Sequence, residues 1–212
     1  MFDRSIQSAL ASVWHAVAAP LERMGVTPNQ VTAAAWITGL ISAGLIASHQ
    51  FSWALLCLLI SRSLDALDGA LARRVGVTDV GGYADIVLDF WFYAAIPLAF
   101  AAANPSSNAL AAAALLASFL LNATSWLALT SMRPPATFEN VPSQRKSLVF
   151  IASLAEGAET LVIYIAMCLW PNQFSWIAWG FAALCLMSAC QRTHMGWKLL
   201  SRPGTQTSTT PE

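Results

Sequence analysis

The sequence predicts an all-α integral membrane protein with six transmembrane helices, preceded by an N-terminal amphipathic helix in the membrane interface. Of the 212 residues, 57% are hydrophobic and only 10% are charged, against about 25% charged residues in a soluble domain. The mean hydropathy is +0.57. Six apolar segments are each long enough to cross the bilayer core, which takes about 20 helical residues. The net charge is zero and no basic stripe appears, so we expect no nucleic-acid partner.

The first predicted element is the amphipathic helix, within residues 1–26. Ile6, Leu10 and Trp14 recur at helical spacing with polar residues between them, a pattern typical of a helix lying in the interface plane. Thr27 and Pro28 then open the membrane domain, since threonine caps helices and proline suits the first helical position. We expect that domain to cover residues 27–202, and the Thr- and Pro-rich residues 203–212 to form a disordered tail.

The six predicted spans are apolar runs separated by short polar breaks. They are Val31–Ser48, Trp53–Arg73, Gly82–Ala103, Leu110–Ser131, Leu148–Trp170 and Trp176–Leu199. Lysine and arginine occur before the first span, at the second–third and fourth–fifth connections and at the end of the sixth span, whereas the other three connections contain none. By the positive-inside rule, both termini and the two basic connections are cytoplasmic.

Four aspartates interrupt the second and third spans. Asp65 and Asp68 are three residues apart, and Asp85 and Asp89 are four apart, so each pair shares one helix face. A short connection predicts that the two helices are antiparallel neighbours, which brings all four carboxylates together at the cytoplasmic end. Ionisable residues inside a membrane are costly and usually functional. Oxygen-only ligands favour Mg²⁺ or Mn²⁺, and two such ions form a clamp suited to displacement at phosphorus.

Two readings compete with a catalytic metal site. In the first, the aspartates form a structural ion-pair network with Arg62, Arg73 and Arg74, although this leaves the nearby glycines unexplained. In the second, they line the pathway of a cation transporter, although transporter acids usually lie near the bilayer midplane. Gly69 and Gly81 instead remove side chains where helices or a nucleotide must approach closely, and an arginine fork suits a diphosphate.

The acidic stretch also carries a family resemblance. The pattern Asp-x2-Asp-Gly-x2-Ala-Arg-x7-Gly-x3-Asp-x3-Asp, from Asp65 to Asp89, resembles the motif of the CDP-alcohol phosphotransferase (CDP-alcohol phosphatidyltransferase) family. The resemblance implies six spans, a homodimer, and an enzyme that transfers a phosphatidyl group from CDP-diacylglycerol to a small polar alcohol with release of CMP. The compact size favours a protein of the bacterial inner membrane, and the positive-inside rule places its active site on the cytoplasmic side.

Residue roles follow from the same resemblance. The implied metal ligands are Asp65, Asp68, Asp85 and Asp89, with Asp89 also the candidate general base. The residues implied to border the CDP group are Asp68, Gly69, Ala72, Arg73 and Gly81. The expected acceptor is glycerol 3-phosphate, then inositol phosphate, then serine. Two alternatives stay open: a catalytically silent scaffold of the same fold, and an enzyme whose CDP is carried by the small alcohol.

Candidate acceptor-binding residues lie later in the chain. Arg145, Lys146 and Arg192 are candidates for binding an acceptor phosphate, although such residues also serve as topology determinants. Glu156 and Glu159 lie in the fifth span, three residues apart. They either accept hydrogen bonds from the acceptor or make a polar contact between helices.

Overall fold

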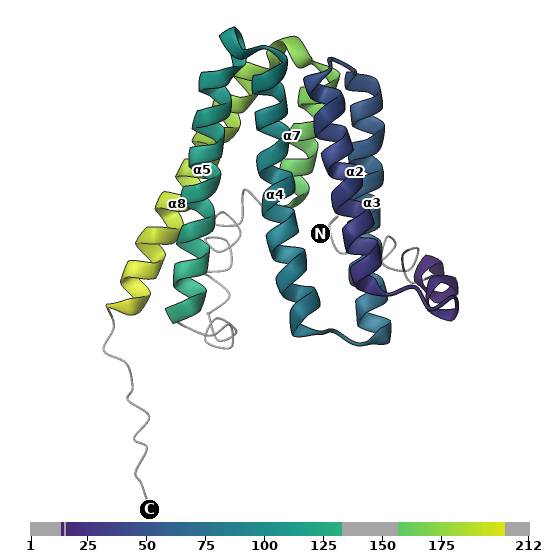
Figure 1. The fold of residues 1–212 in the computed structure, drawn as a ribbon. Helices are drawn as coiled ribbons and strands as arrows, with labels where there is room; N and C mark the ends of the chain where they lie inside the picture. Colours follow the sequence, from purple (N-terminus) through teal and green to yellow (C-terminus); the bar gives the residue numbers. More distant parts are fainter. Residues whose placement is uncertain (1–13, 15, 133–156, 202–212) are drawn as a thin grey trace, which may run out of the picture. The chain divides into compact units, whose positions relative to one another are not determined.

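The computed structural model describes residue 14, residues 16–132 and residues 157–201. Every regular element in these ranges is helical (Figure 1). In chain order the elements are α2 (Pro28–Ala47), α3 (Phe51–Val75), α4 (Asp79–Ala103), α5 (Pro105–Met132), α7 (Gly157–Leu169), the 3₁₀ turn η3 (Pro171–Gln173) and α8 (Phe174–Leu200).

Each of the six predicted spans overlaps one of these helices, and four stretches are long and apolar enough to cross a membrane. These are α2, α4, α5 and the stretch Pro171–Lys198. Helix α3 does not meet the same standard because its charged residues, such as Arg62, Asp65 and Asp68, fall within every window long enough to span. The described part of α7 is apolar but has only 13 residues. The count of six spans therefore stays a prediction, while the all-helical membrane fold is confirmed for the described residues.

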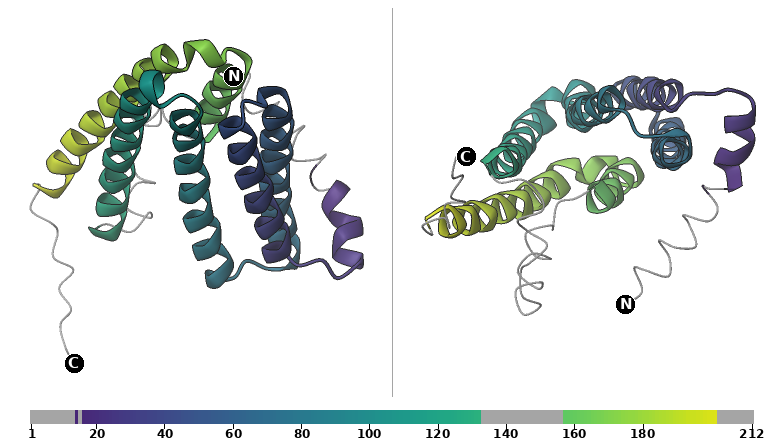
Figure 2. Two further views of the ribbon diagram at one scale, coloured as in Figure 1. Left: turned by 45° about the horizontal axis from the view of Figure 1, so that its top comes forward. Right: turned by 90° about the horizontal axis from the view of Figure 1, so that it is seen from below.

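The chain divides into two compact units, the first comprising residues 1–112 and 164–175. In this unit α2 packs against both α3 and α4, and the views in Figure 1 and Figure 2 agree on this arrangement. Two buried serines join α2 to α3: Ser42 Oγ donates to the Ala54 carbonyl at 2.8 Å, and Ser61 Oγ donates to the Ala35 carbonyl at 2.7 Å. These bonds satisfy the hydroxyl groups inside an apolar interface and fix the register of the two helices.

The starts of α2 and α4 are set by local capping. Thr27 is the N-cap of α2, Pro28 is its first residue, and the Gln30 side chain accepts a hydrogen bond from the Thr27 amide at 2.9 Å. This start was predicted correctly. At α4 the cap is Thr78, whose hydroxyl accepts from the Gly81 amide at 3.1 Å. Helix α4 consequently begins before the expected Gly82.

Part of the N-terminal helix lies within the described residues. Residues 16–23 are helical, and Ala18 is fully buried in a cluster with Val31 and Leu67. An ion pair of 2.7 Å between Glu22 and Arg74 Nε adds a contact between this helix and α3. Residues 1–13 lie outside the described part of the chain, and the position of the helix in a membrane interface stays a prediction.

The second unit comprises residues 113–163 and 176–212. Here α5 and α8 pack through Phe119 and Phe181, whose ring centroids are 5.8 Å apart and nearly perpendicular. One turn after Phe119, Asn122 accepts hydrogen bonds from Arg192 Nη1 of α8 at both its backbone and side-chain oxygens, each at 3.1 Å. The expected tail at residues 203–212 lies outside the described residues.

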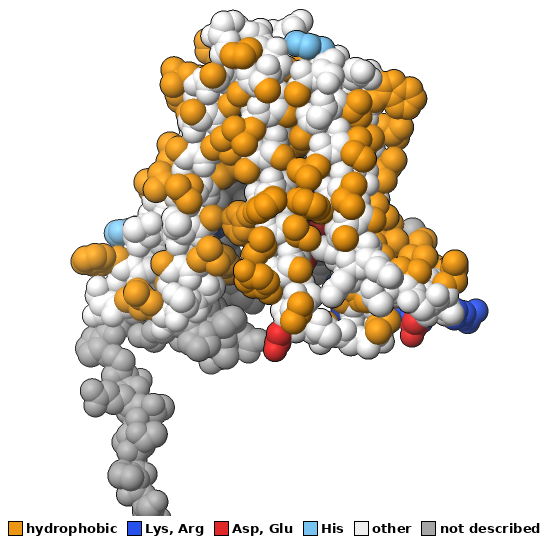
Figure 3. All heavy atoms as spheres, in the orientation of Figure 1, with side chains coloured by type: hydrophobic (Ala, Val, Ile, Leu, Met, Phe, Trp, Pro, Cys, Tyr) orange, Lys and Arg blue, Asp and Glu red, His pale blue; other side chains and the backbone are white. Residues whose placement is uncertain are grey.

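Large apolar side chains are exposed along the helices of the first unit. Trp53, Ile86 and Trp91 are each more than half exposed. In the face shown in Figure 3, hydrophobic side chains cover α2 and α4 along most of their length. Large exposed apolar areas mark surfaces that meet a membrane or a partner, which agrees with an integral membrane protein.

Candidate active site

The structure brings together three of the four predicted aspartates. One carboxylate oxygen from each of Asp65, Asp68 and Asp85 lies within 4.8 Å of the other two. Asp65 and Asp68 come from α3, one turn apart, and Asp85 comes from the second turn of α4. We refer to these three residues as the acidic triad. Two helices thus supply three oxygen ligands around one point, an arrangement suited to a hard divalent cation.

Asp68 is the most buried member of the acidic triad. It is 6% exposed, and its Oδ2 atom has no hydrogen-bond partner among the described residues. Burying a carboxylate oxygen without a partner is costly, and three neighbouring carboxylates repel one another. A bound cation would remove both costs, so the residues present fit a metal ion.

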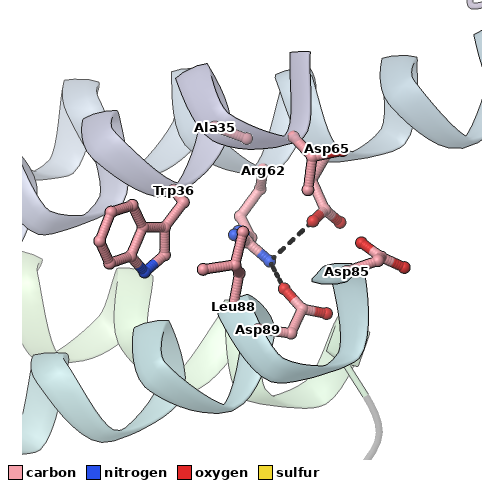
Figure 4. A pocket seen from close by; sticks show the side chains of 8 residues that line it. Ala35, Trp36, Arg62, Asp65, Asp85, Leu88 and Asp89 are labelled. Atoms are coloured by element: carbon pink, nitrogen blue, oxygen red, sulfur yellow. Dashed lines mark hydrogen bonds and ion pairs between the residues drawn. The ribbon is translucent and has the colours of Figure 1, made fainter. Parts of the chain in front are cut away.

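Asp89 stands apart from the triad and faces Arg62. Arg62 Nη1 lies 2.8 Å from Asp89 Oδ1 and 3.4 Å from Asp65 Oδ1, so one guanidinium bridges α3 and α4 (Figure 4). The spacing in sequence suggested that Arg62 pairs with Asp65, three residues away, but it did not suggest the shorter bond to Asp89.

A small pocket opens beside these groups. It is lined by Thr32, Ala35 and Trp36 of α2, Arg62 and Asp65 of α3, and Asp85, Leu88 and Asp89 of α4. In Figure 4, Asp65 and Asp85 point toward one another and Trp36 lies on the other side of Arg62. Sequence reasoning did not assign a role to Trp36, because a tryptophan within an apolar span is typical of packing. Its indole nitrogen is buried without a partner among the described residues.

The residues expected to border CDP lie on the turns next to the triad. Gly69 follows Asp68 directly, and a Cβ built on Gly69 would lie 3.4 Å from Arg73 Nη1, so the Arg73 side chain runs back along α3 beside this glycine. A Cβ on Gly81 would lie 2.9 Å from Thr78 Oγ1 and 3.1 Å from Asn29 Oδ1. Gly81 therefore permits the first turn of α4 to approach the start of α2 closely.

The expected acceptor residues are only partly described. Arg145, Lys146 and Glu156 lie outside the described residues. Glu159 is exposed in the first turns of α7. Arg192 bonds Asn122, and its guanidinium carbon lies 5.3 Å from the Trp126 ring centroid, so this cation is held in place within the second unit.

The chain is similar to known proteins over most of its length. Residues 25–190 match the family model described as CDP-alcohol phosphatidyltransferase. The chain is 37% identical over 200 residues to inner membrane protein YnjF of Escherichia coli, covering 94% of this chain and 97% of that protein. It is 39% identical over 93 residues to an archaetidylinositol phosphate synthase of Pyrococcus horikoshii, covering 38% of this chain and 47% of that protein.

A solved structure shares the fold. The crystal structure of phosphatidylinositol phosphate synthase from Mycobacterium tuberculosis, with CDP-DAG bound, superposes with a TM-score of 0.71 at 20% identity. The match covers 88% of this chain and 94% of that chain. The family match spans both aspartate pairs of the site. This protein therefore belongs to the CDP-alcohol phosphatidyltransferase family and is a membrane transferase of phospholipid biosynthesis.

Proposed function

We propose that the protein transfers a phosphatidyl group from CDP-diacylglycerol to a phosphorylated polyol and releases CMP. The observation that carries this proposal is the acidic triad, in which three carboxylate oxygens lie within 4.8 Å of one another beside a pocket between membrane helices. Support for the donor comes from the related fold that was solved with CDP-DAG bound.

The acidic triad would hold Mg²⁺ or Mn²⁺. Asp65, Asp68 and Asp85 offer only oxygen, the ligand that these hard ions prefer. A divalent ion there would neutralise negative charge on the diphosphate and on the departing CMP. The two ions implied by the family motif stay a prediction.

The neighbouring turns of α3 and α4 would hold the CDP group. Gly69 and Ala72 present little side-chain bulk on the triad side of α3, which leaves room for a nucleotide. Arg73, which is exposed and lies against Gly69, would donate a charge-assisted fork to the phosphates. Gly81 would contribute to the CDP site by letting the start of α4 lie close to α2 beside the nucleotide.

Asp89 would be the general base. Its Oδ1 atom accepts from Arg62 at 2.8 Å, and its side chain is 30% exposed, so the second oxygen is available to an incoming hydroxyl group. In the transfer step the acceptor oxygen bonds to the β-phosphorus of the CDP-lipid and the bond from that phosphorus to CMP breaks. The hydroxyl proton passes to Asp89, which fits a positioned carboxylate acting as base.

Cationic side chains of this chain and the names of two relatives support a phosphorylated acceptor. A phosphate monoester needs cationic donors, and Arg145, Lys146 and Arg192 are the candidates in this chain, with Glu156 and Glu159 as acceptors for its hydroxyl groups. Two relatives are named as synthases of inositol phosphate lipids. These names favour inositol phosphate ahead of glycerol 3-phosphate, which sequence alone placed first, and both stay ahead of serine.

The test is a transfer assay on the purified protein in lipid nanodiscs with Mn²⁺ and CDP-diacylglycerol. Inositol phosphate, glycerol 3-phosphate, inositol and serine are added separately, and both CMP and the lipid product are measured. We expect CMP release with a phosphorylated polyol, and loss of release in Asp89→Asn. Transfer to an unphosphorylated alcohol alone would overturn the acceptor class. Transfer of a small CDP-linked alcohol to diacylglycerol, or metal-ion uptake by liposomes without CMP release, would overturn the reaction.

The protein would act in a bacterial inner membrane as a homodimer, with both termini and the acidic triad on the cytoplasmic side. The alternation of basic and uncharged connections supports this orientation, and the relative from Escherichia coli is named as an inner membrane protein. The phosphorylated acceptor and the released CMP are water-soluble, which suits an acidic triad at the cytoplasmic end of α3 and α4.

A further inference from the structure

Arg62 is a buried cation inside the proposed active site that the family motif does not include. Its side chain is only 10% exposed, and it lies on α3 one turn before Asp65. A buried guanidinium is costly unless carboxylates or other acceptors surround it. Arg62 meets this need with Asp89 Oδ1 at 2.8 Å and Asp65 Oδ1 at 3.4 Å.

The packing around Arg62 holds the guanidinium in one place. Its central carbon lies 4.0 Å from the centroid of the Phe92 ring, a cation–π contact that favours a fixed planar cation. Nη2 donates to Ser61 Oγ at 3.3 Å. Phe92 is itself held against Gly39 of α2, where an added Cβ would lie 2.6 Å from the ring. Three helices therefore fix the position of this one charge.

The position of Arg62 separates Asp89 from Asp65. The acidic triad forms a group of three close oxygens, and Asp89 is not a member of it. The guanidinium lies between Asp65 and Asp89 (Figure 4), which is where a second cation shared by these two carboxylates would have to lie. One positive charge is therefore already present there.

We propose that Arg62 is a positioning residue that keeps Asp89 out of the metal cluster. In the substrate-free enzyme the acidic triad then binds one divalent ion, and Asp89 is held as a base and not as a metal ligand. The proposal rests on the metal site of the proposed function, and it concerns a residue that acts through Asp89. Arginine suits this role because its fork is rigid and always charged.

The test counts Mn²⁺ bound to the full-length, substrate-free protein in nanodiscs by electron paramagnetic resonance. We expect one ion per chain in the wild type, and the same number with unchanged affinity in Asp89→Asn. Arg62→Met, which removes the charge at similar volume, should bind a second ion, because Asp65 and Asp89 then lack their cation. The double variant with Asp89→Asn should return to one ion, and Arg62→Lys should stay at one.

Three results would overturn the proposal. They are two ions in the substrate-free wild type, a loss of Mn²⁺ affinity in Asp89→Asn of at least about tenfold, the size of loss seen even when an outer partner of a metal ligand is removed, and an unchanged ion number in a folded Arg62→Met protein. If Arg62→Met does not fold, the Mn²⁺ affinity of Asp89→Asn in the wild-type background still tests the proposal. In the transfer assay we expect Arg62→Met to lower kcat more than it raises KM for CDP-diacylglycerol. Absence of CMP release by the wild type would instead count against the proposed function, because the ion count does not depend on turnover.

Discussion

At the scale of single residues, Asp68 is the most buried carboxylate of the acidic triad. It is 6% exposed, its Oδ2 atom lacks a partner among the described residues, and two further carboxylates of the acidic triad lie close by. Asparagine has nearly the same shape but no charge, so Asp68→Asn removes the repulsion together with the metal ligand. Asp68→Asn should therefore weaken metal binding but stabilise the metal-free protein.

We predict that Mn²⁺ raises the melting temperature of the wild type but not of Asp68→Asn. A ligand that binds only the folded protein raises its free energy of unfolding by about 2.7 kcal/mol at a concentration about 100 times Kd. Without metal, the variant should melt at or above the wild-type temperature, and its transfer rate should fall by more than about 100-fold. Asp79→Asn is the matched control, because Asp79 is exposed at the first residue of α4. An equal Mn²⁺ response in both variants would contradict the metal assignment.

The convergence of Asp65, Asp68 and Asp85 could be predicted from sequence because helical spacing and a short connection are local facts. Asp65 and Asp68 had to share a face, and α4 had to return beside the triad end of α3. The partner of Arg62 could not be predicted in the same way. Its shortest bond reaches Asp89, 27 residues further along the chain, and this choice depends on how Phe92 and Gly39 pack between α2 and α4.

At the scale of helices, the approach of α2 to α4 is set by Gly39. A Cβ at this position would lie 2.6 Å from Phe92 Cδ2 and 3.0 Å from Ser61 Oγ. Phe92 is 1% exposed and supports the Arg62 guanidinium. A change at Gly39 should therefore reach the active site through one aromatic ring.

We predict that Gly39→Ala destabilises the protein by about 1–3 kcal/mol, as overpacking of a tight interface does. Gly44→Ala on the same helix is the control, since nothing lies within 4 Å of an added Cβ there and alanine favours a helix by about 0.5–1 kcal/mol. Urea or thermal unfolding in one detergent compares the two. Equal stability of the two variants would show that α2 and α4 do not meet at Gly39.

The helices themselves were predictable to different degrees. Apolar length and the Thr27–Pro28 cap predicted α2 well, because both signals are local. The start of α4 was placed too late, since Thr78 caps the helix and takes Gly81 into its first turn. Helix α3 carries too many charges to qualify as a span by composition, so its place beside α2 follows from the serine bonds and the site, not from hydropathy.

At the scale of the whole molecule, orientation in the membrane follows from charge in the connections. We predict that Val77→Cys, between α3 and α4, is labelled from the cytoplasmic side, and that Ser106→Cys, at the start of α5, is labelled from the opposite side. Both positions are exposed. The background is a chain whose four native cysteines are replaced by alanine, and inverted vesicles of known sidedness with a membrane-impermeant maleimide give the readout. Labelling of both cysteines from one side would contradict the alternating topology.

The family and the membrane class could be inferred from sequence because eight fixed positions and an apolar composition are properties of the chain alone. The acceptor could not be inferred, because its candidate residues lie far from the motif and three of them, Arg145, Lys146 and Glu156, are outside the described residues. A sequence pattern shows which side chains are present, whereas an acceptor pocket depends on which of these side chains the fold brings together.

The most direct test of the central claim is the anomalous scattering of Mn²⁺ in crystals of the protein soaked with MnCl₂ and CDP-diacylglycerol. We expect an anomalous peak within bonding distance of Asp65, Asp68 and Asp85, with the diphosphate of the lipid next to it and Arg62 still bonded to Asp89 in crystals that lack the lipid. A manganese-free triad beside bound CDP-lipid, or carboxylates of α3 and α4 that point apart, would contradict the account.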